Sequence, residues 1–219
     1  MLLNANTEVN ARDLHNNTPF SLASSMDRTE LTRELLRVGA NHIGREFCRT
    51  GLMDACMLED KNSITYLLQG RADVRLKSWN SKASALHVAA YRGNSDIVQA
   101  LVYRGVEVNE EDKHGDTLIG GACRGNHPNI VKFLVTQGAL LDSKAYSDGP
   151  MLCYAARRGM MAMVEALASE GVDLNATGID GETALELASK HDHQDVANFL
   201  RLGDSYSFEE IIECGKINT

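Results

Sequence analysis

One interval dominates this sequence, because similar segments return about every 33 residues. The segment SALHVAAYRGNSDIVQALVYRGVEVN (84–109) shows the unit. Apolar residues within 86–90 form a stripe at helical spacing, and those within 97–102 form a second one. Gly93 lies between them and can end the first helix in the left-handed conformation. Neither short helix can bury its stripe alone, so the unit requires neighbours of the same kind.

The unit recurs along nearly the whole chain. Equivalent alanines of the first helix stand at Ala23, Ala55, Ala89, Ala122, Ala155 and Ala188. By subtraction, their intervals are 32, 34, 33, 33 and 33 residues. Self-similarity at such a period indicates a solenoid, in which consecutive units share one continuous core.

The motifs of these units resemble those of the ankyrin repeat family. Three first helices open with segments similar to the family's Thr-Pro-Leu-His-x-Ala motif: TPFSLA (18–23), SALHVA (84–89) and TALELA (183–188). Several second helices end in segments similar to its exit: LLRVGAN (35–41), LLQGRADV (67–74), LVYRGVEVN (101–109), LVTQGALLD (134–142) and LASEGVDLN (167–175). The resemblance implies an all-α solenoid of helix-turn-helix units joined by hairpin-like turns. It also implies that partners bind across the turns and the concave face made by the first helices.

The register predicts an ankyrin array over 1–203 and a C-terminal capping helix and tail over 204–219. The array is expected to hold a partial repeat at 1–13 and six repeats that begin near 18, 50, 84, 117, 150 and 183. Ser207 and Glu210 form a capping box for the predicted last helix. The second repeat is one residue short, so the local geometry of 42–83 is left open.

Composition narrows the function classes. A formal net charge of −8 argues against a nucleic-acid binder, which usually carries a basic surplus. The sequence has no apolar run near the roughly 18 residues that a membrane span needs. Five cysteines without a CxxC pair predict a reducing, intracellular location, cytoplasmic or nuclear, with delivery into a host cell as an alternative for a pathogen protein. Cys56 and Cys123 directly follow aligned alanines and are expected to be small buried packing residues.

No catalytic or cofactor motif stands out. Glycines are spread at repeat intervals rather than clustered in a phosphate-binding loop. His191 and His193 flank Asp192, but residues two apart on a helix do not face each other, so a metal site is not predicted. We therefore expect no enzymatic activity, no cofactor and no metal.

Large apolar residues stand at several predicted turn tips, where Gly, Asn, Asp and Ser are usual. Trp79, the only tryptophan, is surrounded by polar residues in LKSWNSK. Two interpretations stay open: it folds back to fill the irregular repeat, or it anchors a partner as binding hot spots often do. Phe47 and Tyr146 are further candidates of this kind.

A second set of candidates follows the aligned alanines by two or three positions, at the exposed ends of the first helices. The apolar or aromatic members are Met57 and Tyr91, and the cationic members are Arg92, Arg124, Arg157, Arg158 and Lys190. Stacking should bring equivalent cations into a ladder, namely Arg92, Arg124, Arg157 and Lys190. Either each cation pairs with a neighbouring carboxylate, or together they attract an acidic peptide.

These features predict a non-catalytic protein-interaction scaffold that binds a partner segment, possibly an acidic one, across its concave face. The alternative is a recognition domain cut from a larger enzyme, channel or secreted pathogen effector, since the chain begins inside a repeat. Neither hypothesis involves nucleic acid, and the oligomeric state is left open. Reversing Arg124, Arg157 and Arg158 to Glu is expected to weaken partner binding without lowering thermal stability.

Overall fold

The structure is a computed structural model of the 219-residue chain. It describes residues 8–9, 11, 13–14, 17–26, 28–37, 51–57, 59–69, 72–78, 80–141 and 149–203. The predicted capping helix at 204–219, and most of the partial repeat predicted at 1–13, lie outside these residues.

The described residues form helices and no strands, which confirms the all-α fold class. The helices come in consecutive pairs: α1 (Pro19–Ser25) with α2 (Thr29–Arg37), α3 (Gly51–Met57) with α4 (Lys61–Gln69), α5 (Ala85–Arg92) with α6 (Ser95–Val102), α7 (Leu118–Arg124) with α8 (Pro128–Thr136), α9 (Met151–Arg157) with α10 (Met161–Ser169), and α11 (Ala184–Lys190) with α12 (Gln194–Gly203). Each first helix begins one residue after a repeat start expected from the sequence. The chain divides into two compact units, Met1–Val106 and Glu107–Thr219.

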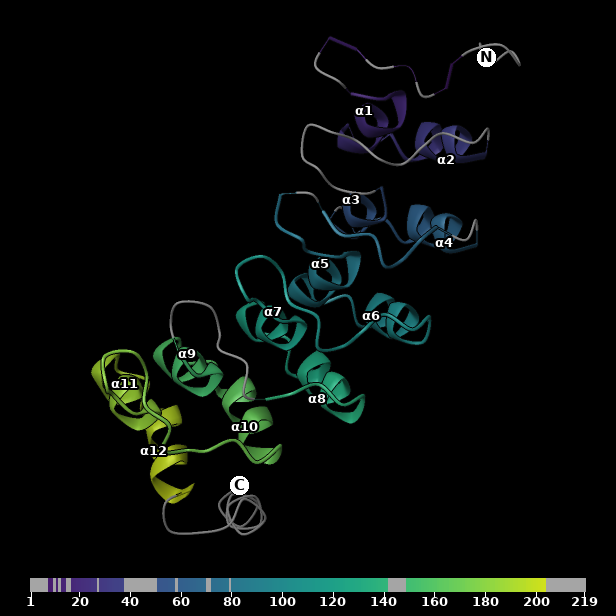
Figure 1. Cartoon of the computed structure of the whole chain (residues 1–219). Coiled ribbons are helices and arrows are strands. Elements are labelled where there is room, and N and C mark those ends of the chain that lie inside the picture. The colour runs from purple at the N-terminus through teal and green to yellow at the C-terminus, as the bar shows by residue number, and fades with distance from the viewer. Residues whose placement is uncertain are drawn as a thin grey trace. The chain divides into compact units, whose positions relative to one another are not determined.

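In the first unit, α3 packs between α1 and α5, and each of these helices packs against the second helix of its own pair. Figure 1 shows this as two rows of short helices, α1, α3 and α5 in one and α2, α4 and α6 in the other. Phe20, Leu52, Leu86 and Leu101 are almost completely buried between the rows. The apolar stripes seen in the sequence therefore make the core.

The second unit repeats the arrangement with α7, α9 and α11 in one row and α8, α10 and α12 in the other (Figure 1). Its largest fully buried side chains are Leu118, Ile119, Ile130, Leu134, Leu152, Met163 and Leu167. Small residues such as Ala122 and Ala155, both fully buried, allow the helices to approach closely.

Local chemistry sets where the helices begin and end. The Thr117 hydroxyl accepts a hydrogen bond from the Gly120 backbone N–H at 3.2 Å, which caps α7. Pro128 occupies the first turn of α8, where its missing N–H costs nothing. Gly93 ends α5 with φ at 86°, in the left-handed region where a side chain would be strained, as the sequence predicted.

The connections between pairs are hairpin-like. Isolated antiparallel bridges join Lys77 to Ser84, Glu111 to Thr117 and Thr177 to Thr183. Asn109 links consecutive repeats of the second unit: its Nδ2 donates to the Gly138 carbonyl and its Oδ1 accepts from the Leu140 N–H, both at 2.9 Å. These bonds fix the backbone that leads into each next first helix.

Within the described part of the chain, every helix is too short or too polar to cross a bilayer.

Candidate partner-binding surface

The structure describes seven of the ten candidate binding residues. Phe47, Trp79 and Tyr146 lie outside the described residues, so the turn-tip hypothesis stays a prediction. The described candidates are all at or next to the C-terminal ends of first helices: Met57, Tyr91 and Arg92 in the first unit, and Arg124, Arg157, Arg158 and Lys190 in the second. Arg92 belongs to the first unit, whereas the other cationic candidates belong to the second. The predicted ladder of cations is therefore examined within the second unit alone.

In the first unit, the ends of α3 and α5 bring an apolar and a cationic candidate into contact. The Arg92 Nη2 lies 3.0 Å from the Met57 Sδ, so the guanidinium covers the thioether. Tyr91 is 51% exposed beside it, and Met26, just after α1, is 65% exposed. Exposed methionine and tyrosine side chains suit adaptable apolar contacts with a partner.

In the second unit, Arg124 is held by its own repeat. Its Nη1 donates to Asp116 Oδ1 at 2.5 Å and its Nη2 to Asp116 Oδ2, a bidentate ion pair. The Asp116 side chain is only 9% exposed and that of Arg124 is 22% exposed. Charge-assisted bidentate pairs in such surroundings hold firmly. Arg124 thus belongs first to the structure of its repeat.

This pair corrects the expectation that Arg124→Glu would leave thermal stability unchanged. A glutamate at position 124 would face the mostly buried Asp116 carboxylate, which would also lose its compensation by the guanidinium. Charge reversal at Arg124 therefore cannot report on binding alone.

Lys190 is paired in the same way but more loosely. Its Nζ donates to Glu182 Oε1 at 2.7 Å, with 60% of the lysine side chain exposed. Such an exposed pair contributes little stability. It nevertheless offsets the positive charge of Lys190 at the surface.

Arg157 ends α9 and is half-buried. Its backbone carbonyl lies 3.1 Å from the His193 Nε2, which joins neighbouring repeats. A Cβ at Gly159 would come within 2.4 Å of the His193 Nδ1, so the imidazole packs directly on that glycine. His193 is thus accounted for by a structural contact.

Arg158 follows α9 and is exposed. Its guanidinium carbon Cζ lies 5.1 Å from the centroid of the Tyr154 ring, one helical turn earlier. The Tyr154 residue itself is only 6% exposed. This geometry is a cation–π contact, in which the ring supports the guanidinium from the inner side.

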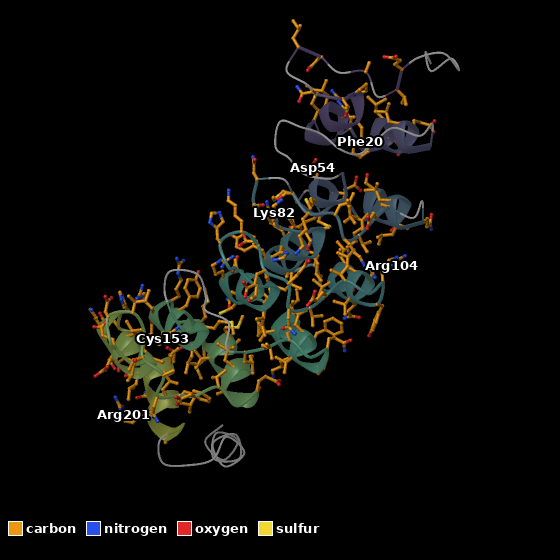
Figure 2. All side chains as sticks on the ribbon, viewed as in Figure 1. Phe20, Asp54, Lys82, Arg104, Cys153 and Arg201 are labelled. Carbon is orange, nitrogen blue, oxygen red and sulfur yellow. The ribbon has the colours of Figure 1, made fainter. Side chains whose placement is uncertain are left out.

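The buried thiols offer no reactive group. Cys56 and Cys123 are fully buried, as expected, and burial raises the pKa of each thiol to about 12. Burial also raises the pKa of Cys153, labelled on α9 in Figure 2. Thiols held in the protonated form are poor nucleophiles and poor metal ligands. Groups of three His, Cys, Asp or Glu side chains suited to a metal ion do not occur among the described residues.

The sequence interpretation missed the regular placement of acids. Asp116 precedes Arg124 by eight residues, and Glu182 precedes Lys190 by the same number. The acid lies in the turn and the cation at the end of the following helix, so the turn folds the two together. Comparing the repeats for this spacing would have found both pairs.

Stacked helix pairs of this kind define the class of helical solenoid proteins, and comparison with known proteins identifies the family. A family model described as ankyrin repeats (3 copies) matches residues 52–145 and 140–208. The chain belongs to the ankyrin repeat family, whose fold mediates protein–protein interaction.

Particular relatives and a solved structure agree. An ankyrin repeat domain-containing protein from the fungus Stachybotrys chartarum is 31% identical over 169 residues, covering 76% of this chain and 8% of the relative. The mouse B-cell lymphoma 3 protein homolog is 28% identical over 185 residues, covering 80% of this chain and 41% of the relative. The crystal structure of the ankyrin repeat domain of Bcl-3, described as a unique member of the IkappaB family, aligns with a TM-score of 0.68 and 26% identity, covering 89% of this chain and 86% of that one. The chain thus spans less than half the length of both curated relatives.

Proposed function

We propose that this chain is a non-catalytic interaction module in which the first-helix ends of a unit bind an extended or helical segment of a partner protein. The observation that carries the proposal is the set of exposed side chains there. Tyr91 and Met26 offer apolar contact in the first unit, and Arg158 and Lys190 present cations in the second. An acidic segment complements that second group, in a chain whose net charge is −8 as a whole.

The proposal is tested by charge reversal at two exposed cations that pair with no buried carboxylate. A double variant, Arg158→Glu with Lys190→Glu, should lose partners captured from extracts of the source cells, with apparent affinity lowered at least tenfold. Both side chains are exposed, so the free energy of unfolding should change by no more than about 1 to 2 kcal/mol.

A control for charge reversal on another surface is Lys132→Glu. Lys132 is an exposed cation on the second helix α8, so its reversal changes the charge on a different surface of the same unit. The Lys132→Glu protein should still capture the partner proteins from extracts, whereas the double variant should not. Equal capture by wild type and the double variant would contradict binding at the first-helix ends.

A second candidate is that these repeats are the recognition part of a longer enzyme, channel or secreted effector. The length of the relatives favours it, because this chain matches 8% of the fungal relative and 41% of the mouse one. An antibody against the repeats, used on extracts of the source cells, would distinguish the two: a single band near 24.0 kDa contradicts the longer protein.

We place the module in the cytoplasm or nucleus. The support is chemical: Cys56, Cys123 and Cys153 are free thiols packed in the core, which suits a reducing compartment. Fluorescent tagging of the complete protein in its own cells tests this location.

A further inference from the structure

Arg158 differs from the other cations of the second unit in how its side chain is held. Its guanidinium lies over the Tyr154 ring at 5.1 Å, and that residue is fixed in the core with 6% exposure. The Arg158 backbone N–H is bonded to the Ala155 carbonyl, so the residue is anchored at the end of α9. Both ends of this arginine are therefore tied to one helix.

A cation–π contact of this kind restrains a guanidinium for recognition. The Arg158 Cζ lies over the Tyr154 ring, and the N–H donors of a guanidinium lie in the plane of the group, where they can meet a ligand at its edges. A carboxylate that meets such an edge can accept two parallel hydrogen bonds. Because the ring already restrains the long side chain, less rotamer entropy is lost when a ligand binds.

The charges of the neighbouring repeats make Arg158 distinctive. The helix-end cations of the flanking repeats, Arg124 and Lys190, are each offset by an acid eight residues earlier. At the equivalent place in the middle repeat the chain has Gly149, preceded by Asp148, which lies outside the described residues. The end of α9 carries two arginines, Arg157 and Arg158, where each flanking repeat has one cation.

The positions that match Arg158 on the packed neighbours α7 and α11 carry no acid either. They are Gly125 and the exposed His191. Among the described residues, no carboxylate forms an ion pair with Arg158. The repeat register therefore puts a glycine and a histidine, not a carboxylate, at the matching positions of the neighbouring repeats, and Arg158 keeps a positive charge without an ion-pair partner among the described residues.

We propose that Arg158 binds one carboxylate of the partner segment, from a glutamate or aspartate side chain, through a bidentate pair at the edge of a guanidinium supported by Tyr154. This deepens the proposed function and rests on it. A surplus of one charge matches a carboxylate better than a phosphate group, which carries nearly two charges and is usually bound by a cluster of arginines. The remaining contacts of the segment would set affinity, and Arg158 would set where its acid must lie.

The test uses the full chain and a random 12-residue peptide display library as the probe. Peptides selected on the wild type are expected to share one Asp or Glu, whose change to Asn or Gln lowers affinity about tenfold. Arg158→Lys keeps the charge but removes the planar fork. It should lower affinity for the acidic peptide by a similar factor and abolish the difference between Glu and Gln, as measured by calorimetry.

Lys132→Arg is the matched control, because it alters an exposed cation on α8, away from the first-helix ends; affinity should change less than twofold. Equal affinity of wild type and Arg158→Lys for the acidic peptide would overturn the carboxylate site. If, in that case, the Arg158→Glu, Lys190→Glu double variant no longer bound the peptide, the proposed function would stand although the Arg158 site had failed. If both Arg158→Lys and the double variant bound the peptide as tightly as wild type, the Arg158 site and the proposed function would both be overturned.

Discussion

At the scale of single residues, three cations at equivalent helix ends differ in what surrounds them. Arg124 is clamped by a carboxylate that is 9% exposed, Lys190 meets its acid in solvent, and Arg158 rests on a ring. The same formal charge therefore has three roles. In Arg124 it holds a turn, in Lys190 it balances the charge of a surface acid, and in Arg158, by our proposal, it binds a ligand. Charge in a sequence predicts attraction most strongly where no internal partner compensates it.

The Arg124–Asp116 pair gives the first residue-scale prediction. Arg124→Met should lower the free energy of unfolding by about 3 kcal/mol, because the Asp116 carboxylate would lose its guanidinium in a mostly buried place. The double variant Arg124→Met, Asp116→Asn should recover most of that loss, since the buried carboxylate charge is removed as well. Chemical denaturation of the four proteins in this cycle measures both effects. Additive losses would show that the pair is not coupled.

At the scale of elements, short helices depend on their ends. First helices such as α7 and α11 have only seven residues, well below the length at which an isolated helix is stable in water. Caps and packing must therefore supply the stability that intrinsic helix propensity does not. In α11, Thr183 and Glu186 form a capping box: the Glu186 carboxylate accepts from the Thr183 N–H at 2.8 Å, and the Thr183 hydroxyl accepts from the Glu186 N–H at 3.2 Å.

This box makes stability depend on pH. The hydrogen bonds from the Thr183 backbone and hydroxyl lower the pKa of Glu186 below its ordinary value of 4.5. A lowered folded-state pKa means that the stabilisation is complete above the unfolded pKa and is lost as the pH falls through the folded one. Glu186→Gln should therefore lower Tm slightly at neutral pH, and the difference from wild type should shrink as the pH falls below 4.5 through the folded-state pKa.

Thermal melts of wild type and Glu186→Gln, from neutral to acid pH, measure this difference in Tm. Glu165→Gln, at an exposed position on the second helix α10, matches the change in charge without touching a cap. A difference between wild type and Glu186→Gln that is the same at every pH would contradict the role of the ionised carboxylate.

At the scale of the whole molecule, stability comes from contacts between adjacent helix pairs within each unit. In the second unit, α9 packs against α7 and α11, while α10 packs against α8 and α12. A chain built this way has mostly short-range contacts, so a local defect should spread to the nearest repeats first. The six helix pairs need not lose structure together.

Leu167→Ala tests this. Leu167 is fully buried in α10, and its truncation should cost about 3 kcal/mol through lost burial and the cavity left behind. Hydrogen exchange should accelerate most in α8 to α12 and least in α3 and α4. A uniform increase over all described helices would indicate one cooperative unit instead.

The sequence by itself determined the repeat, the helix pairs and their ends. These follow from local rules, namely apolar residues at helical spacing, a threonine that caps, and a glycine such as Gly93 that ends a helix. The burial of Cys56 and Cys123 was predictable for the same reason, since the register places both beside an aligned alanine. Even the Tyr154–Arg158 contact follows from a local spacing, because residues four apart lie on the same face of a helix.

Only the tertiary structure decided which charges are compensated. Asp116 and Arg124 are eight residues apart and meet because the turn folds back on the helix that follows it; neither lies in the other's helical neighbourhood. Packing likewise decided that the Tyr154 ring is held in the core, since the neighbouring repeats bury it. Local periodicity reports which face a residue occupies, but pairing and exposure depend on what other segments bring to that face.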